Sequence, residues 1–238
     1  DDVEISLPIE KILDNNGDVL LAYKMNNQEL LPDHGFPLRL IVPGYVGIRN
    51  IKWVKSIKLS ETPVNSAWHS SISYKCLPNY IKNKEQLKNI NLDLDNYNSM
   101  YCLPVQSFIC DVVEEEEYYI IKGIAYSGGG RGILRVDVSI DDGYTWDIAE
   151  LKEGNEQNVL KSWAWTFWEY KVDKSEVQEN LLLNDFYNDY LPLFKKNKLK
   201  IMCKATDIDN NVQNKSLEDA WNLRGLNNNS YHKYIYEY

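Results

Sequence analysis

Short apolar segments alternate with polar turns over the first 60 residues. Apolar positions in the segment 6–13 recur with helical spacing, and Ser6 is expected to cap this predicted helix. Apolar runs over 19–23 and 37–42 predict strands, and Asn26-Asn27 predicts a turn between them. This alternation of short helices and strands indicates an α+β segment.

From residue 103 onward, apolar and polar residues alternate with a period of two, as in half-buried strands. The alternation is clearest over 134–140 and 199–205, and the hairpin signal Asp141-Asp142-Gly143 follows the first run. Two predicted strand faces carry the residues Leu134, Val136, Val138 and Ile140 in one case and Trp163, Trp165 and Phe167 in the other. Strands of this length with regular turns predict an immunoglobulin-like β-sandwich.

The segment between these two patterns differs in composition. Residues 80–100 are polar and rich in Asn, with little periodicity, which predicts a long surface connection. The fold is therefore expected to be mainly β with an α+β N-terminal portion. The predicted domains are residues 1–100, which end in an Asn-rich linker, and residues 101–238.

The overall charge narrows the range of partners. The 238 residues include 26 Lys and Arg against 35 Asp and Glu, for a net charge of −9. Such a chain repels polyanions, which argues against nucleic acid and against anionic membranes as partners. No apolar run approaches the roughly 20 residues that span a bilayer, and no signal peptide is visible. A first residue of Asp is expected of a fragment or a processed product.

The cysteines match no metal or redox motif. None lies in a Cys-x-x-Cys pair, which argues against a zinc ribbon or a redox dithiol. We expect buried free thiols and no metal ligand among the four cysteines, which are Cys76, Cys102, Cys110 and Cys203.

Basic residues gather near the strand predicted over 37–42. Arg39 lies inside an apolar run, where a guanidinium needs an anionic partner, either a structural carboxylate or a bound phosphate. Arg49 and Lys52 follow a Gly-containing loop, so these cations are expected to form a basic cradle for a phosphorylated cofactor. His34, a lone histidine in a turn-like segment, is by itself more typical of a structural or exposed residue.

Other features have ordinary structural explanations. The run Gly128-Gly129-Gly130 is followed by Arg131 and a strand rather than by Lys-Ser or Lys-Thr and a helix, so it predicts a tight turn with positive φ. The acidic residues around 141–147 lack the spacing of a calcium-binding loop. Taken alone, Tyr74 and Arg224 are compatible with ordinary surface positions.

Longer motifs carry a specific resemblance. Residues 34–44, His-Gly-Phe-Pro-Leu-Arg-Leu-Ile-Val-Pro-Gly, and the following 52–55, Lys-Trp-Val-Lys, resemble the molybdopterin-binding segment of the eukaryotic sulfite oxidase and nitrate reductase family. The second half resembles that family's dimerisation domain at residues 104–107, 127–133, 135–139, 163–165 and 221–225. The motifs keep the family's order and spare mainly residues 80–100, where an inserted surface loop is expected.

The resemblance implies a molybdenum centre held by a pyranopterin cofactor. It implies that His34, Arg39 and the stretch Asn50-Ile51-Lys52 bind the pterin and its phosphate, with the backbone N–H groups of Asn50 and Ile51 as donors. The family's molybdenum-ligating Cys lies upstream of the residue matching His34, and no Cys precedes Cys76 here. These residues alone are therefore expected to be inactive.

Two positions imply sulfite as the substrate. Arg224 lies in Trp-Asn-Leu-Arg-Gly, where nitrate reductases have Met, and Tyr74 lies in a Tyr-Lys pair typical of sulfite oxidases. The implied reaction is an oxygen-atom transfer from molybdenum that yields sulfate, with Arg224 binding the anion and Tyr74 donating a hydrogen bond. Because Arg224 is assigned to the second domain, the pocket is expected between the domains. A nitrate reductase and a non-catalytic dimerisation module are the alternatives.

The resemblance also implies a homodimer through the β domain. It leaves the electron acceptor open between cytochrome c and oxygen. Family members occur in the mitochondrial intermembrane space and in peroxisomes. The C-terminal Tyr-Glu-Tyr is not a Ser-Lys-Leu signal, which favours the mitochondrial compartment.

Overall fold

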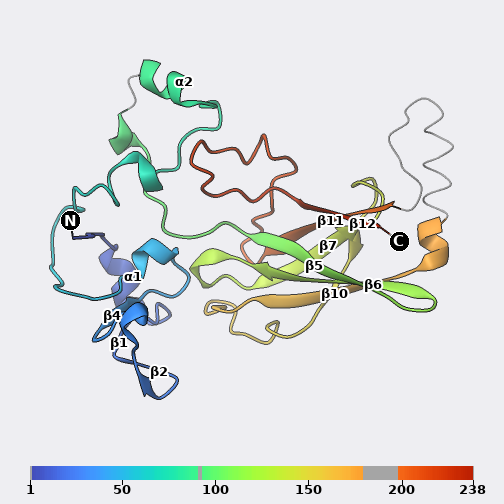
Figure 1. Ribbon diagram of the computed structural model, residues 1–238, viewed down its shortest axis with the longest axis horizontal. Coiled ribbons are helices and arrows are strands. Elements are labelled where there is room, and N and C mark those ends of the chain that lie inside the picture. The colour runs from blue at the N-terminus through green and yellow to red at the C-terminus, as the bar shows by residue number, and fades with distance from the viewer. Residues whose placement is uncertain (1, 91–92, 179–197, 238) are drawn as a thin grey trace. The chain divides into compact units, whose positions relative to one another are not determined.

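The computed structural model describes residues 2–90, 93–178 and 198–237. Contacts between Cα atoms divide the chain into two compact units. The first unit comprises residues 1–104 together with 128–130 and 218–228, and the second comprises residues 105–127, 131–217 and 229–238. Each unit has its own strands (Figure 1). No helix in the described ranges has both the length and the hydrophobicity that crossing a bilayer requires.

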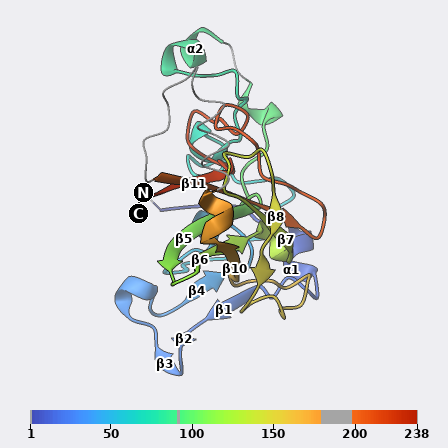
Figure 2. The ribbon, with the colours of Figure 1, turned by 90° about the vertical axis from the view of Figure 1, so that its right-hand side faces the viewer.

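The first unit contains short elements, as its sequence pattern predicts. Helix α1 spans Ile9–Leu13, and strand β1 (Leu20–Ala22) pairs antiparallel with β4 (Arg39–Ile41). Strands β2 (Lys24–Met25) and β3 (Gln28–Glu29) form a hairpin near them (Figure 2). Its turn residues, Asn26 and Asn27, have φ values of 53° and 62°, which Asn tolerates better than most residues.

The predicted cap of α1 is wrong. The N-cap residue is Pro8, and no side chain caps the helix. The hydroxyl of Ser6 instead accepts a hydrogen bond from the backbone N–H of Val64, at 2.7 Å. Ser6 therefore ties the start of the chain to a distant loop rather than to its own helix.

Several 3₁₀ helices and one further α-helix complete the first unit. The Asn-rich stretch is more structured than its composition suggests. It contains α2 (Lys84–Asn89), capped by the Asn83 side chain, which accepts from the N–H of Gln86. Just before it, Ile81 is completely buried. The 3₁₀ helices are η1 (Pro32–His34), η2 (Gly47–Arg49), η3 (Ile72–Tyr74), η4 (Leu94–Asn96) and η5 (Gly128–Gly130).

The second unit is a sandwich of two antiparallel four-stranded sheets, which confirms the predicted fold class. One sheet has the order β5-β6-β10-β9, with β5 spanning Gln106–Glu114, β6 Tyr118–Tyr126, β10 Thr166–Asp173 and β9 Glu150–Leu151. The other has the order β12-β11-β7-β8, with β12 spanning His232–Glu237, β11 Lys198–Asp207, β7 Ile133–Ser139 and β8 Asp147–Ile148. Figure 1 shows β5, β6 and β10 running side by side.

The core of the sandwich departs from the sequence pattern in two places. Leu134, expected on the buried face, is 54% exposed, because a register shift at Thr206/Asp207 places Ile133 inward instead. The aromatic run begins before β10, and Trp165 and Phe167 are exposed, whereas their neighbour Trp168 is completely buried. The alternation was recognised correctly there, but the larger aromatic face lies outside the core.

Two turn predictions are confirmed. Gly129 and Gly130 have φ values of 75° and 82°, the positive values expected of the glycine run. In the hairpin after β7, Asp142 and Gly143 also have positive φ. The Asp141 carboxylate accepts hydrogen bonds from the backbone N–H groups of Tyr144 and Thr145, so it closes the turn.

The cysteine prediction is correct only in part. The structure places no disulfide between the four cysteines, but only Cys203 is buried, and Cys110 is exposed. Burial raises the pKa of the Cys203 thiol to about 12, so this side chain behaves as an apolar core residue at neutral pH.

Candidate functional site

A tight glycine turn brings three of the predicted cofactor-binding residues together. Gly35 follows η1 with a φ of 106°, and a Cβ atom added to it would lie 3.0 Å from the Cβ of Lys52 and 3.2 Å from that of Arg39. His34 immediately precedes it. Glycine is therefore needed here both for its backbone conformation and for the close approach of two cationic side chains.

Arg39 has no acidic partner. Its Nη1 donates to the backbone oxygen of His34 at 3.0 Å, and its Nε is buried without a hydrogen-bond partner. The Nζ of Lys52 likewise donates to a backbone oxygen, that of Asp33, at 2.8 Å. Of the two partners predicted for Arg39, the carboxylate is not found among the described residues. A buried donor left open beside a second cation suits an anionic group.

The Asn50-Ile51 stretch contributes one open donor rather than two. The N–H of Asn50 donates to the oxygen of Gly47 at 3.0 Å and closes η2, so its predicted role as a backbone donor to the cofactor is wrong. The Asn50 side chain holds the loop, accepting from the N–H of Val42 at 2.7 Å. The N–H of Ile51 makes no hydrogen bond within the described part of the chain.

Arg49 does not join this cradle, contrary to prediction. Its side chain is completely buried, and its Nε and Nη2 donate to the oxygen of Met100 at 3.2 and 3.0 Å. Its Nη1 lies 2.9 Å from Nδ1 of His69, and its guanidinium lies 4.9 Å from the centre of the Tyr101 ring. Arg49 thus organises the segments around residues 69 and 100.

The segment that carries Arg224 is fixed onto residues just after Tyr74. Trp221 Nε1 donates to the oxygen of Ile81 at 3.0 Å, and Asn222 Nδ2 donates to the oxygen of Leu77 at 3.1 Å. Asn227 Nδ2 lies 2.9 Å from the sulfur of Cys76. The expected assignment of Arg224 to the second domain is therefore wrong by contact, since residues 218–228 belong to the first unit, as Tyr74 does.

Both predicted substrate-binding side chains have open polar groups. Arg224 is exposed, and its backbone N–H donates to the buried side chain of Asn222 at 2.9 Å, which shapes the turn. Tyr74 is half-buried at the end of η3, with its ring 6.4 Å from that of Trp68. Neither side-chain polar group has a hydrogen-bond partner among the residues described.

The residue after Tyr74 adds another buried cation. Lys75 is 7% exposed, and its Nζ donates to the backbone oxygen of Tyr97 at 2.8 Å. No ion pair between described residues includes Lys75 or Arg49. In a chain with a net charge of −9, unneutralised buried cations beside Tyr74 create a local positive field.

Sequence reasoning missed His69. It is 4% exposed, and burial, followed by the charges of Arg49 and Lys75, lowers its pKa. A lone His in a segment without clear periodicity carries no signal of this kind, because its partners are 20 and 6 residues away.

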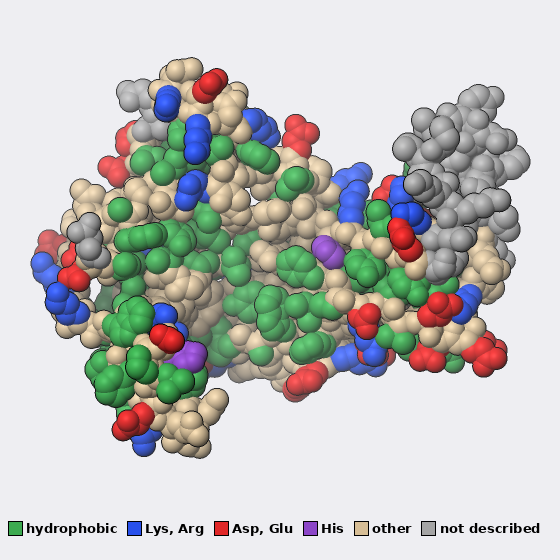
Figure 3. Space-filling model, in the orientation of Figure 1, with side chains coloured by type: hydrophobic (Ala, Val, Ile, Leu, Met, Phe, Trp, Pro, Cys, Tyr) green, Lys and Arg blue, Asp and Glu red, His purple; other side chains and the backbone are tan. Residues whose placement is uncertain are grey.

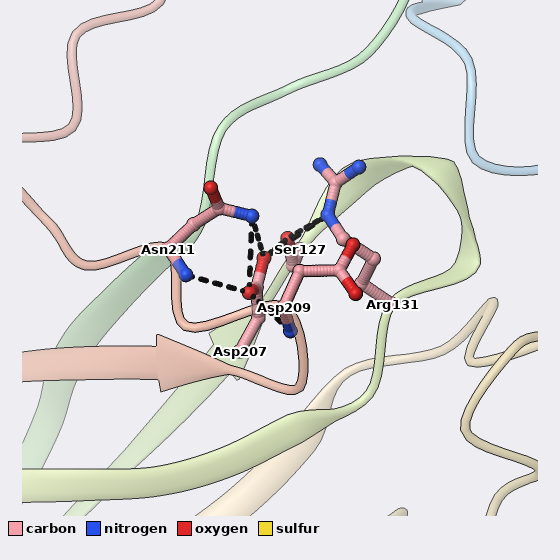
Figure 4. Close-up of polar contacts among 5 residues, drawn as sticks. All are labelled: Ser127, Arg131, Asp207, Asp209 and Asn211. Atoms are coloured by element: carbon pink, nitrogen blue, oxygen red, sulfur yellow. Dashed lines mark hydrogen bonds and ion pairs between the residues drawn. The ribbon is translucent and has the colours of Figure 1, made fainter.

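The second unit has a separate polar cluster around Asp207, at the end of β11 (Figure 4). Its carboxylate accepts from the hydroxyl of Ser127 at 2.7 Å, from Nε of Arg131 at 3.0 Å and from the side chain of Asn211 at 3.0 Å. Backbone N–H groups of Asp209 and Asn211 add two more bonds. Every acceptor position is used, so this cluster is structural.

Comparison with known families gives this geometry a context. The model of the Mo-co oxidoreductase dimerisation domain matches residues 89–237, and that of the oxidoreductase molybdopterin binding domain matches residues 1–68. A molybdopterin-binding part followed by a dimerisation domain defines the chain as a molybdenum oxidoreductase.

Individual relatives narrow this class. The chain is 39% identical to mitochondrial sulfite oxidase of Rattus norvegicus over 96% of its own length and 38% of the rat protein. It is 34% identical to sulfite oxidase of Arabidopsis thaliana, covering 97% of the chain and 54% of that protein. Among solved structures, the sulfane dehydrogenase SoxCD from Paracoccus pantotrophus matches with a TM-score of 0.66 and 25% identity, over 97% of this chain and 51% of that one. The chain belongs to the sulfite oxidase family, and it spans only about two fifths to just over half of these relatives.

Proposed function

We propose that this chain is the C-terminal part of an enzyme that oxidises sulfite to sulfate at a molybdenum-molybdopterin centre. The observation that carries the proposal is the attachment of the Arg224 turn to residues 76–81, directly after Tyr74 and Lys75. This attachment assembles, within one unit, an exposed guanidinium, a phenol with an open hydroxyl and a buried ammonium. A small dianion needs such a set of donors and positive charge.

The cradle around Gly35 fits the phosphate of the pterin cofactor. Arg39 with its open Nε, Lys52 and the N–H of Ile51 would hold the phosphate, and His34 and Asn50 would shape the surrounding loops. When bound, the cofactor supplies the molybdenum that transfers an oxygen atom and takes up two electrons.

The family's ligand Cys has no counterpart among the four cysteines, and the described residues contain no group of three or more metal-ligating side chains. These 238 residues alone should therefore be inactive and hold no molybdenum. Stoichiometric metal in an elemental analysis of the purified chain would contradict this.

The residues of this chain then have distinct roles. Arg224 would bind sulfite through its guanidinium and compensate the charge of the anion. Tyr74 would donate its hydroxyl proton in a hydrogen bond to an oxygen of the anion and orient it. Lys75, fixed on the oxygen of Tyr97, would add positive potential without direct contact.

Replacing Arg224 by Met tests this assignment. Removing one partner of a charged pair costs about 2 kcal/mol or more, so kcat/KM for sulfite should fall by about 30-fold or more, mainly through KM. The measurement is sulfite-dependent reduction of an acceptor by the cofactor-loaded protein that contains this chain.

Lys58→Gln is the matched control, because Lys58 is exposed and has no partner among the described residues. It should leave the kinetics unchanged. Equal kinetics in the Arg224→Met variant and the control would rule out the site. Nitrate reduction by the unsubstituted protein would favour the nitrate reductase alternative.

We further propose that two copies associate through the second unit, whose family is named for dimerisation. Its sheet β5-β6-β10 exposes apolar residues on its outer face. Phe108 and Phe167 lie on either side of Ile124 in the strand register, and they are 37% and 46% exposed. Figure 3 shows acidic and basic side chains interspersed, with groups of hydrophobic side chains exposed between them. Apolar surface of this kind marks association sites.

Sedimentation velocity tests the dimer. We expect a dimer mass at micromolar concentration, and we expect Phe167→Glu to shift the equilibrium toward monomer because it places a charge in an apolar contact. A charge of the same sign on the first unit, Lys58→Glu, should leave the mass unchanged. A monomeric mass for the unsubstituted chain would refute the proposal.

The names of the rat and human relatives support a mitochondrial location. We propose the intermembrane space, with cytochrome c or oxygen as the electron acceptor. Cell fractionation tests the compartment, and detection in peroxisomes would contradict it.

A further inference from the structure

Arg49 is buried in a way that needs explanation. A completely buried guanidinium is costly unless it is paired, yet its partners are a backbone oxygen, an imidazole and an aromatic ring, all of them neutral. No carboxylate among the described residues pairs with it. The positive charge therefore remains available to an anion that the protein itself does not provide.

The contact with Arg49 determines the tautomer of His69. A guanidinium has only donors, so Nδ1 of His69, 2.9 Å from Nη1 of Arg49, must be the acceptor and carry no proton. The ring is then neutral, and its proton is on Nε2. The lowered pKa of His69, caused by burial, Arg49 and Lys75, agrees with a neutral ring.

The protonated nitrogen of His69 has no partner. Although the residue is 96% buried, Nε2 makes no hydrogen bond with any residue that the structure describes. It is also not one of the fully buried polar atoms left without a partner, so it borders the small exposed part of the ring. An N–H donor with a fixed tautomer and an accessible edge is suited to an acceptor from outside the chain.

His69 and Arg49 are connected directly to Tyr74. The N–H of Met100 donates to the oxygen of Tyr74 at 2.8 Å, and the oxygen of Met100 accepts both bonds from Arg49. The hydroxyl of Ser99 donates to the oxygen of His69 at 2.9 Å. The segment 99–100 thus joins Arg49, His69 and Tyr74 within a single unit.

We infer that His69 is a further oxyanion-binding residue of the Tyr74–Arg224 site, and that Arg49 is a positioning residue that acts through it. This inference rests on the proposed function, because it assigns the same substrate anion to the site. Nε2 of His69 donates to an oxygen of sulfite or sulfate, Arg49 keeps that nitrogen protonated, and the charge of the anion offsets the buried guanidinium.

Nitrogen NMR of the chain labelled with ¹⁵N-histidine tests the inference without any activity assay. The chain has three histidines, and His69→Gln assigns the ring of interest. His232 is an internal control, because the N–H of Ile109 donates to its Nδ1 at 3.1 Å and fixes the same tautomer independently of Arg49. His34 is exposed and reports general ionic effects.

Sulfate serves as the unreactive probe anion. On titration with sodium sulfate at constant ionic strength, we expect Nε2 of His69 to shift and saturate while both His232 nitrogens stay unchanged. A His69 signal that does not move, or equal shifts at all three rings, overturns the assignment of His69 as an anion ligand.

Variants of Arg49 test the positioning role. In Arg49→Gln the His69 Nδ1 signal should move toward that of a protonated nitrogen as the tautomers mix, and the Kd for sulfate should rise about tenfold. Arg49→Lys keeps the charge and one donor, so both effects should be smaller. The exposed Lys58→Gln removes the same charge and should change neither.

An unchanged His69 tautomer in Arg49→Gln overturns the positioning role, whatever happens to the affinity. If Arg49→Gln does not fold, Arg49→Lys and the sulfate titration of the unsubstituted chain decide the matter. Failure of the proposed function is distinguishable, because it is read from the effect of Arg224→Met on sulfite kinetics in the cofactor-loaded protein.

Discussion

Replacement of Asp207 by Ala should lower the free energy of unfolding by about 3–5 kcal/mol, the range found when one partner of a buried charged network is removed. The carboxylate is completely buried and accepts bonds from three side chains and two backbone N–H groups (Figure 4). Without it, the Ser127 hydroxyl and both backbone donors are left open in the interior, and the Arg131 charge loses its partner.

The Asp207 effect has a matched control in the same turn. Asp209 is exposed and contributes only its backbone N–H to the cluster, so Asp209→Ala should change the stability by no more than about 0.5 kcal/mol. The measurement is urea-induced unfolding of both variants. Coincident unfolding curves would show that the network does not stabilise the second unit.

The same carboxylate has a defined pH dependence. Burial acts to raise the pKa of Asp207, but hydrogen bonds from Asn211 and Ser127 and the charge of Arg131 outweigh it, so the pKa is lowered. The stabilisation is therefore fully present above the unfolded pKa of about 3.9 and is lost as the pH falls below it. The difference between Asp207→Ala and the unsubstituted chain should accordingly shrink in acid.

Replacement of Trp168 by Ala should destabilise the second unit by about 3–5 kcal/mol, the cost of deleting a large, completely buried aromatic side chain. Trp168 packs where β6 has no side chain: a Cβ added to Gly123 would lie 2.2 Å from Cζ2 of the indole. With Gly123 opposite, no neighbouring side chain can fill the space that the indole leaves, so the cavity persists.

Two further variants separate burial from aromaticity. Trp168→Phe keeps much of the volume and removes an indole N–H that has no partner in the described structure, so it should cost less than Trp168→Ala. Tyr144→Ala removes an 84% exposed aromatic side chain from the same unit and should have little effect. Equal urea midpoints for Trp168→Ala and Tyr144→Ala would contradict the packing argument.

Local pattern predicted the elements better than it predicted their faces. The hairpin after β7 and the Asn26-Asn27 turn follow from positive φ preferences that a few adjacent residues express. Leu134 fits the alternation equally well, but it lies outward because of a register shift in the partner strand β11. A shift of this kind depends on residues about 70 positions away, so no local pattern contains it.

The candidate site shows the same limit. The cradle around Gly35 was predictable because its residues lie within one short stretch, and only the Asn50 donor was misjudged, since η2 uses it. Arg49, by contrast, was grouped with Lys52 from its position in the sequence, whereas its side chain contacts His69 and Met100. The resemblance to a known family identified Arg224 and Tyr74, but only the contacts placed them in one unit.

The attachment of residues 221–227 to residues 76–81 also sets an order of events during synthesis. The three hydrogen bonds that make it join residues 140 to 151 positions apart. A ribosome releases the chain from its N-terminus, so most of the first unit emerges long before the strand of residues that completes it. Those early residues must wait, with the buried surface of Ile81 and Leu77 uncovered, until the sandwich between them has been made. A nascent chain of this design therefore has an aggregation-prone interval about 140 residues long, which makes it a plausible client for chaperones that hold incomplete domains.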